Sequence, residues 1–131
     1  MSSTTISGYT AKAIDEMAAI HGGAVKLAGA ELGVESFGMQ VFDFPAGFDQ
    51  YPEHDHAQEG QEEVYVVLQG SAEFEIDGER VAIDPGRILR VGAGSRRKLL
   101  PGAKGVRILA LGCTPGKLYE RPQDFRLADA S

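Results

Sequence analysis

The chain has little that would stabilise or anchor it by means other than its own fold. Cys113 is its only cysteine among 131 residues, so no intrachain disulfide can form and a reducing compartment fits. No apolar stretch approaches the ~20 residues that a membrane span needs. The first residues lack the charged and apolar blocks of a signal peptide. We therefore predict a cytoplasmic protein that has no membrane partner.

An excess of positive charge is also absent. Thirteen lysines and arginines face nineteen acidic residues, and the net charge of −6 argues against a nucleic-acid partner. Several basic residues nevertheless gather in one part of the chain, namely Arg87, Arg90, Arg96, Arg97 and Lys98. The composition therefore predicts a local positive patch on an acidic protein.

What the sequence does contain is a series of short apolar segments between turns. A chain of 131 residues is about one domain, so we treat residues 1–131 as a single domain, and the 17 glycines indicate many tight turns. Asp77-Gly78 is a strong two-residue hairpin signal. Many short strands without alternating helices predict an antiparallel sandwich or barrel. The expected strands are residues 37–44, 62–69, 72–76, 81–83, 88–91, 96–100 and 106–112.

The two ends of the chain follow other patterns. Thr10 is a candidate cap for a short N-terminal helix that runs to about Ile20 and stops at Gly22-Gly23. Residues 24–33 fit a short helix or an edge strand equally. From Thr114 onward, prolines and mixed charges predict a tail that packs loosely along the barrel.

The expected strand at residues 62–69 is apolar on both faces. Val64, Val66 and Leu68 share one face, whereas Tyr65 and Val67 share the other with Glu63. One face meets the barrel core, and the other needs a second cover. The N-terminal segment or a second copy of the chain would supply it, which makes a homodimer the expected assembly.

Two of the three histidines stand close together in the sequence. His54 and His56 are two residues apart, which places both imidazoles on one face of an extended segment, and Glu63 follows after a short loop. Two imidazoles and one carboxylate form a facial triad suited to a divalent transition metal. The plainer alternative is a pair of solvated surface histidines, and Glu59 or Gln61 are further candidate ligands if the loop folds inward.

At these residues the chain resembles the cupin superfamily. The first cupin motif has a glycine, His-x-His, a glutamate and a further glycine, which correspond to Gly47, His54, His56, Glu63 and Gly70. The six residues between Glu63 and Gly70 match the family spacing, whereas the interval between His56 and Glu63 is longer than usual. Such differences are changes of loop length, which folds tolerate.

The second cupin motif is kept in its spacing but not in its side chains. Laid on residues 86–101, the motif's proline falls on Gly92, its asparagine on Pro101 and its metal-ligand histidine on Arg97. The resemblance covers roughly residues 37–112. It implies an all-β, antiparallel double-stranded β-helix, or jelly-roll barrel, with a site in the barrel mouth and often a dimeric assembly. Cupins include dioxygenases, isomerases, decarboxylases and binding proteins, so the fold does not give the function.

Arg97 leaves two interpretations of the site. A guanidinium has only donors and stays protonated, so it cannot coordinate a metal, but it pairs well with carboxylates. In the first interpretation the triad holds Fe(II), Mn(II), Ni(II) or Zn(II), and Arg97 grips an anionic substrate. In the second, Arg97 pairs with Glu63 and takes the place of the metal.

Three aromatic residues complete the expected site. Tyr65 and Phe42 are expected to line the barrel, where core packing is the plainer role, and Tyr51 precedes His54 as a candidate lip of the mouth. The leading hypothesis is a small-molecule-binding cupin with an anionic ligand held at Arg97. One alternative is a metal-dependent dioxygenase or isomerase, and another is a non-catalytic dimeric barrel.

Overall fold

Two long strands dominate the molecule. The computed structural model describes residues 8–127, and its longest elements are β4 (Glu62–Ile76) and β7 (Arg97–Cys113). The other strands are β1 (Ala19–Ile20), β2 (Val25–Lys26), β3 (Gly38–Phe44), β5 (Glu79–Ile83) and β6 (Ile88–Val91). One α-helix, α1 (Ala28–Leu32), and three 3-10 turns complete it: η1 (Ile14–Glu16), η2 (His21–Gly23) and η3 (Gln123–Phe125). Among these helices, none is long and apolar enough to cross a membrane.

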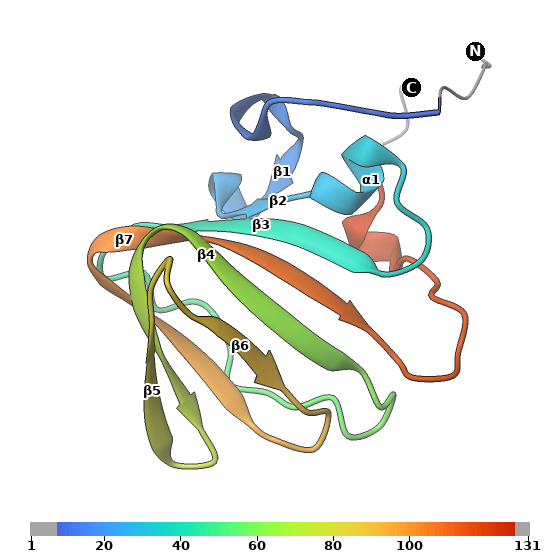
Figure 1. The fold of residues 1–131 in the computed structure, drawn as a ribbon. Coiled ribbons are helices and arrows are strands. Elements are labelled where there is room, and N and C mark those ends of the chain that lie inside the picture. The colour runs from blue at the N-terminus through green and yellow to red at the C-terminus, as the bar shows by residue number, and fades with distance from the viewer. Residues whose placement is uncertain (1–7, 128–131) are drawn as a thin grey trace.

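All strand pairs are antiparallel, in the order β1-β2-β3-β7-β4-β5 with β6 on β4. The first half of β4 pairs with β6 and with the end of β7, whereas its second half pairs with β5 and with the start of β7. Figure 1 shows both long strands curving from the layer of β3 into that of β5. The expected all-β antiparallel architecture is confirmed.

The bend in the long strands needs glycine. Gly70 has a φ of 80°, and a Cβ there would lie 2.2 Å from the carbonyl oxygen of Gly105 on β7. Register shifts between Val67 and Gln69 and between Gly70 and Ala72 turn β4 without ending its pairing. For each bend the sequence predicts two separate strands, one on either side, namely 62–69 with 72–76 and 96–100 with 106–112. The structure has one continuous strand in each case.

Alternation along β3 separates two cores. Its Gly38, Gln40, Phe42 and Phe44 face the barrel interior, whose fully buried residues include Tyr65, Phe74, Leu99 and Ile108. On the other face of β3, Val41 packs with Met17 and Ala28 in a smaller cluster beneath the N-terminal elements. The even face of β3 therefore supplies the wall of any site inside the barrel.

The predicted helix from Thr10 to Ile20 is wrong. The segment forms only the turn η1 before β1, and Met17 reaches the core from extended backbone beside it. Pairing of β1 with β2 extends the sheet, and this tertiary pairing outweighs a weak helical pattern. The short N-terminal helix is α1 instead, and Gly33 ends it with a φ of 78°. The turn predicted at Asp77-Gly78 is confirmed, with φ angles of 50° and 88°.

Candidate metal and ligand site

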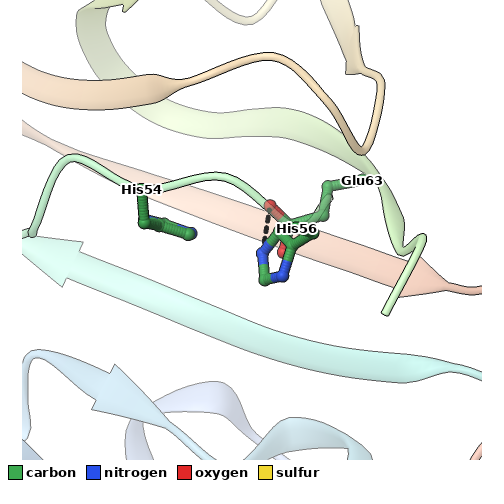
Figure 2. A group of neighbouring side chains, drawn as sticks. All are labelled: His54, His56 and Glu63. Atoms are coloured by element: carbon green, nitrogen blue, oxygen red, sulfur yellow. Dashed lines mark ion pairs between the residues drawn. The ribbon is translucent and has the colours of Figure 1, made fainter. Parts of the chain in front are cut away.

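The three predicted metal ligands meet at one end of the barrel. His54 and His56 lie in the loop between β3 and β4, and Glu63 lies near the start of β4 (Figure 2). One ligand atom from each residue falls within 4.8 Å of the others. Backbone hydrogen bonds fix the loop: His54 exchanges two with Arg97, at 3.1 and 2.8 Å, and His56 donates one to Ala93 at 2.8 Å.

The Nδ1 atom of each imidazole already has an oxygen partner, which leaves Nε2 as the nitrogen available to a metal. His54 Nδ1 lies 2.8 Å from the carbonyl oxygen of Pro52, which only accepts, so this nitrogen carries the proton. His56 Nδ1 contacts the carboxylate of Glu59 in the same way. His56 Nε2 is buried and lies 3.5 Å from Glu63 Oε1, beyond the roughly 3.2 Å of a well-formed hydrogen bond, and it has no hydrogen-bond partner among residues 8–127. An Nδ1 held by an oxygen and an unsatisfied Nε2 are what a metal-ligating histidine shows, so these residues fit a divalent metal.

Glu63 is held by three donors. Gln61 Nε2 donates to Oε2 at 3.0 Å, and the Tyr65 hydroxyl and the Arg97 guanidinium both donate to Oε1. Burial acts to raise the pKa of Glu63, but His56, Tyr65 and Arg97 together outweigh it and hold the pKa below its usual value. The carboxylate is therefore ionised at neutral pH, as a metal ligand must be.

Arg97 lies behind the site and is fully buried. Besides Glu63, its guanidinium donates to the carbonyl oxygens of Ser95, at 3.1 Å, and Gly92, at 2.7 Å. Its charge is thus paired, as burial demands, and the pairing of Arg97 with Glu63 raised by the sequence is the arrangement present. This pairing is the one in the second interpretation, and it leaves Arg97 no route to grip a substrate as the first interpretation expected. The triad nevertheless still converges, so a metal remains compatible with the pair.

The wider basic patch is largely neutralised by carboxylates. Arg90 points outward and pairs with Glu62 at 2.7 Å, as expected from its position in β6. Arg96 lies 3.7 Å from Glu53 and 3.9 Å from Asp55. Neither arginine is directed into the barrel, so the local patch adds no charge to the cavity.

A cavity of about 420 Å³ opens beside the triad. Its wall includes His54, His56 and Glu63, and six of the other lining residues are phenylalanines or tyrosines. The Phe42 ring stacks on Phe44 at 5.1 Å between centroids, and Phe44 stacks on Phe48 at 4.4 Å. The volume lies within the range typical of small-molecule pockets.

The expected ligand-binding residues divide into two groups. Phe42 and Tyr51 line the cavity, with Tyr51 largely buried in the core as well. Tyr65 and Arg97 lie behind the wall, where the Tyr65 hydroxyl contacts Glu63 and lies 3.3 Å from that of Tyr51. Tyr65 and Arg97 therefore act on the cavity through Glu63.

Sequence reasoning missed several cavity residues. Gln40 and Phe44 follow from the alternation that identified Phe42, so the period of β3 was sufficient to find them. Tyr119 and Phe125 come from the C-terminal tail, which was expected only to pack along the barrel. No local pattern in the tail signals which of its side chains turn inward.

Comparison with known proteins identifies the class of protein. A model of the cupin domain family matches residues 40–111, more than half of the chain. The chain therefore belongs to the cupin family. No curated protein matches the chain.

Solved structures support the same fold. A cupin protein from Bacteroides fragilis has a TM-score of 0.68 at 20% identity, with 89% of this chain and 93% of that chain covered. A predicted oxalate decarboxylase from Thermotoga maritima has a TM-score of 0.54 at 23% identity, covering 60% and 68%. The DMSP lyase DddQ from Ruegeria pomeroyi has a TM-score of 0.54 at 27% identity, covering 65% and 42%.

Proposed function

We propose that this cupin binds a divalent transition metal through His54, His56 and Glu63 and holds a small molecule against it in the adjacent cavity. The observation that carries the proposal is the buried Nε2 of His56, which lacks a hydrogen-bond partner among the described residues while its Nδ1 is held by Glu59. An unsatisfied buried nitrogen is costly, and a metal ion satisfies it.

Neighbouring residues orient the three candidate metal ligands. Pro52 and Glu59 fix the tautomers of His54 and His56, and the three donors on Glu63 fix its carboxylate. When bound, a divalent metal polarises an oxygen of its ligand as a Lewis acid. Three protein ligands leave coordination positions open toward the cavity for such an oxygen.

The charges in the site favour an anionic donor on the ligand. Arg97 and Glu63 carry opposite charges and pair directly, so they cancel. The charge of a divalent metal would then remain largely uncompensated by the residues that hold it. The anionic ligand expected from the sequence therefore stays part of the proposal, with the metal in place of Arg97 as the group that attracts it.

The test is a measurement of metal content and affinity. We expect protein purified without added metal or affinity tag to take up one zinc or manganese ion per chain in calorimetric titrations. His54→Ala and His56→Ala should abolish this uptake, whereas His21→Ala, which changes the one cavity histidine outside the triad, should preserve it. Equal uptake by all three variants would disprove the proposed site.

Turnover is a second candidate function. Open coordination positions next to a cavity would suit a metal-dependent dioxygenase or isomerase, the alternative raised by the resemblance. Structural neighbours include proteins described as a DMSP lyase, a predicted oxalate decarboxylase and a putative sugar phosphate isomerase. Product formation that requires metal and is lost in His56→Ala would establish catalysis. Ligand recovered unchanged from the metal-loaded protein would leave the binding function alone.

A further inference from the structure

We propose that the ligand of this cavity is a flat, largely apolar molecule with an aromatic ring, carrying its oxygen donors at one end only. The inference rests on the proposed function for the donor end, which would lie at the metal. The ring end is argued independently, from the walls of the cavity.

The wall of the cavity carries six aromatic side chains. Phe42, Phe44 and Phe48 form a continuous stack, and Tyr51 meets Phe42 edge-on at 5.8 Å between centroids. Tyr119 and Phe125 contribute two further rings to the wall. Aromatic rings pair in stacked or edge-on geometries and gain more than the burial of their surface alone. We therefore expect this wall to bind a flat aromatic ring more tightly than a saturated group of the same size.

Charge is confined to one end of the cavity. Among the described residues that line it, Glu63 is the only acidic side chain, and none is a lysine or arginine. The other polar side chains of the wall are the amides of Gln40, Gln50 and Gln61, the phenols of Tyr51 and Tyr119, and the imidazole of His21, which Glu63 does not approach as it approaches that of His56. A ligand with a second ionised group, such as a dicarboxylate or a phosphorylated sugar, would bury that group without a partner at high cost. The cavity therefore accommodates a ligand whose ionised or oxygen donor groups all lie at one end.

The C-terminal segment, residues 114–127, limits the size of the ligand. Tyr119 and Phe125 are its two partly buried aromatic residues, and both line the cavity. Tyr119 lies against β3 at Gly38, where an added Cβ would approach its hydroxyl to 3.2 Å. The segment follows residues 40–111, which match the family model, so this wall is an addition to the family core.

Few contacts hold this segment in place. Thr114 donates to the carbonyl oxygen of Glu59 at 3.0 Å, and Arg121 donates to that of Val34. Glu59 is also the partner of His56, so the tail touches the loop that carries the metal site. The segment has no strand pairing in the structure, so a side chain changed here alters the wall without disturbing the barrel.

The experiment compares three small molecules that share the same oxygen donors and differ in whether they contain an aromatic ring, a saturated ring or no ring. Salicylate, its saturated analogue 2-hydroxycyclohexanecarboxylate and 3-hydroxypropionate each carry a hydroxyl and a carboxylate in the same relation. Calorimetric titration into zinc-loaded protein gives their affinities, corrected for the affinity of each probe for aqueous zinc. We expect salicylate to bind at least about tenfold more tightly than 3-hydroxypropionate, with the saturated ring between them. Equal affinities for the three would overturn the proposal.

A pair of variants in the tail tests the wall itself. Phe125→Ala should weaken salicylate several-fold while leaving the affinity for zinc and for 3-hydroxypropionate unchanged. Leu118→Ala is the matched control, because Leu118 lies in the same segment but is 96% exposed. It should change none of these values. An unchanged salicylate affinity in Phe125→Ala would show that the tail does not contact the ligand.

A last arm separates this inference from the metal hypothesis. 2-Naphthol, titrated into metal-free protein and followed by NMR of the protein's aromatic rings, should shift the signals of Phe42, Phe48 and Phe125. Such shifts in a protein that takes up no metal would retain the ligand class and remove the proposed function. Uptake of one zinc ion, together with equal affinities for the probes with and without a ring, would retain the proposed function and remove the ligand class.

Discussion

Replacement of Arg97 by methionine tests how the site is balanced without metal. Arg97 is fully buried and Glu63 is mostly buried, so the substitution leaves an ionised carboxylate without its cation. It also removes the donors to the carbonyl oxygens of Ser95 and Gly92. Breaking one side of a buried ion pair costs about 3–5 kcal/mol. At about 4 °C per kcal/mol for a domain of this size, Tm should fall by roughly 12–20 °C.

The assay is urea unfolding in the presence of a chelator, with a matched control on the surface. Arg90→Met breaks the pair with Glu62, whose side chains are 68% and 41% exposed, and should cost less than about 1 kcal/mol. Adding Glu63→Gln to Arg97→Met should recover part of the loss, because the uncompensated charge is then gone. A loss in Arg97→Met no larger than that in Arg90→Met would refute the reasoning.

Three further predictions follow from the same geometry. Arg97→His places an imidazole where the cupin motif has its last metal ligand and should tighten zinc binding on the order of tenfold, measured by competition with a chelating dye. Glu63 and Glu59, against partial burial, raise the pKa of His56 above 6.5 in the metal-free protein. The protonated imidazole therefore adds to the free energy of unfolding, fully below pH 6.5, and this contribution is lost as pH rises through the pKa of His56 in the folded protein. Urea unfolding of the metal-free protein at several pH values should show this loss, and His56→Gln should not show it. The homodimer expected from the apolar face of Val64, Val66 and Leu68 would also bury Ile88, which is 71% exposed on β6 opposite Val66. Sedimentation should therefore give a dimer for the unsubstituted chain and a monomer for Ile88→Lys.

The cluster of His54, His56 and Glu63 was predictable because its signals are local. The spacing of His54 and His56 and the interval from Glu63 to Gly70 identified the cluster and the frame that contains it. The presence of glycine at position 70 has a direct physical cause, because any side chain there would collide with Gly105 across the bend. Such constraints act between neighbours in sequence or across one strand pair, so they can be read from residue types.

The remainder depends on contacts between distant segments. Residues 10–20 do not form the predicted helix because β1 pairs with β2. The ion pair between Arg97 and Glu63 depends on the register in which β4 pairs with β7. Tyr119 and Phe125 reach the cavity from a tail whose sequence carries no periodicity. The aromatic end of the cavity was therefore visible only in the folded molecule, although Phe42 and Tyr51 pointed toward it.

The central claim is that His54, His56 and Glu63 form a metal centre despite the arginine behind them. Anomalous diffraction from crystals grown with zinc tests it most directly. We expect one strong anomalous peak per chain, at a zinc ion bonded to Nε2 of both histidines and to a carboxylate oxygen of Glu63, with Arg97 still donating to that carboxylate. A map with no peak between these three residues, from crystals grown in excess zinc, would show that they do not form a metal centre.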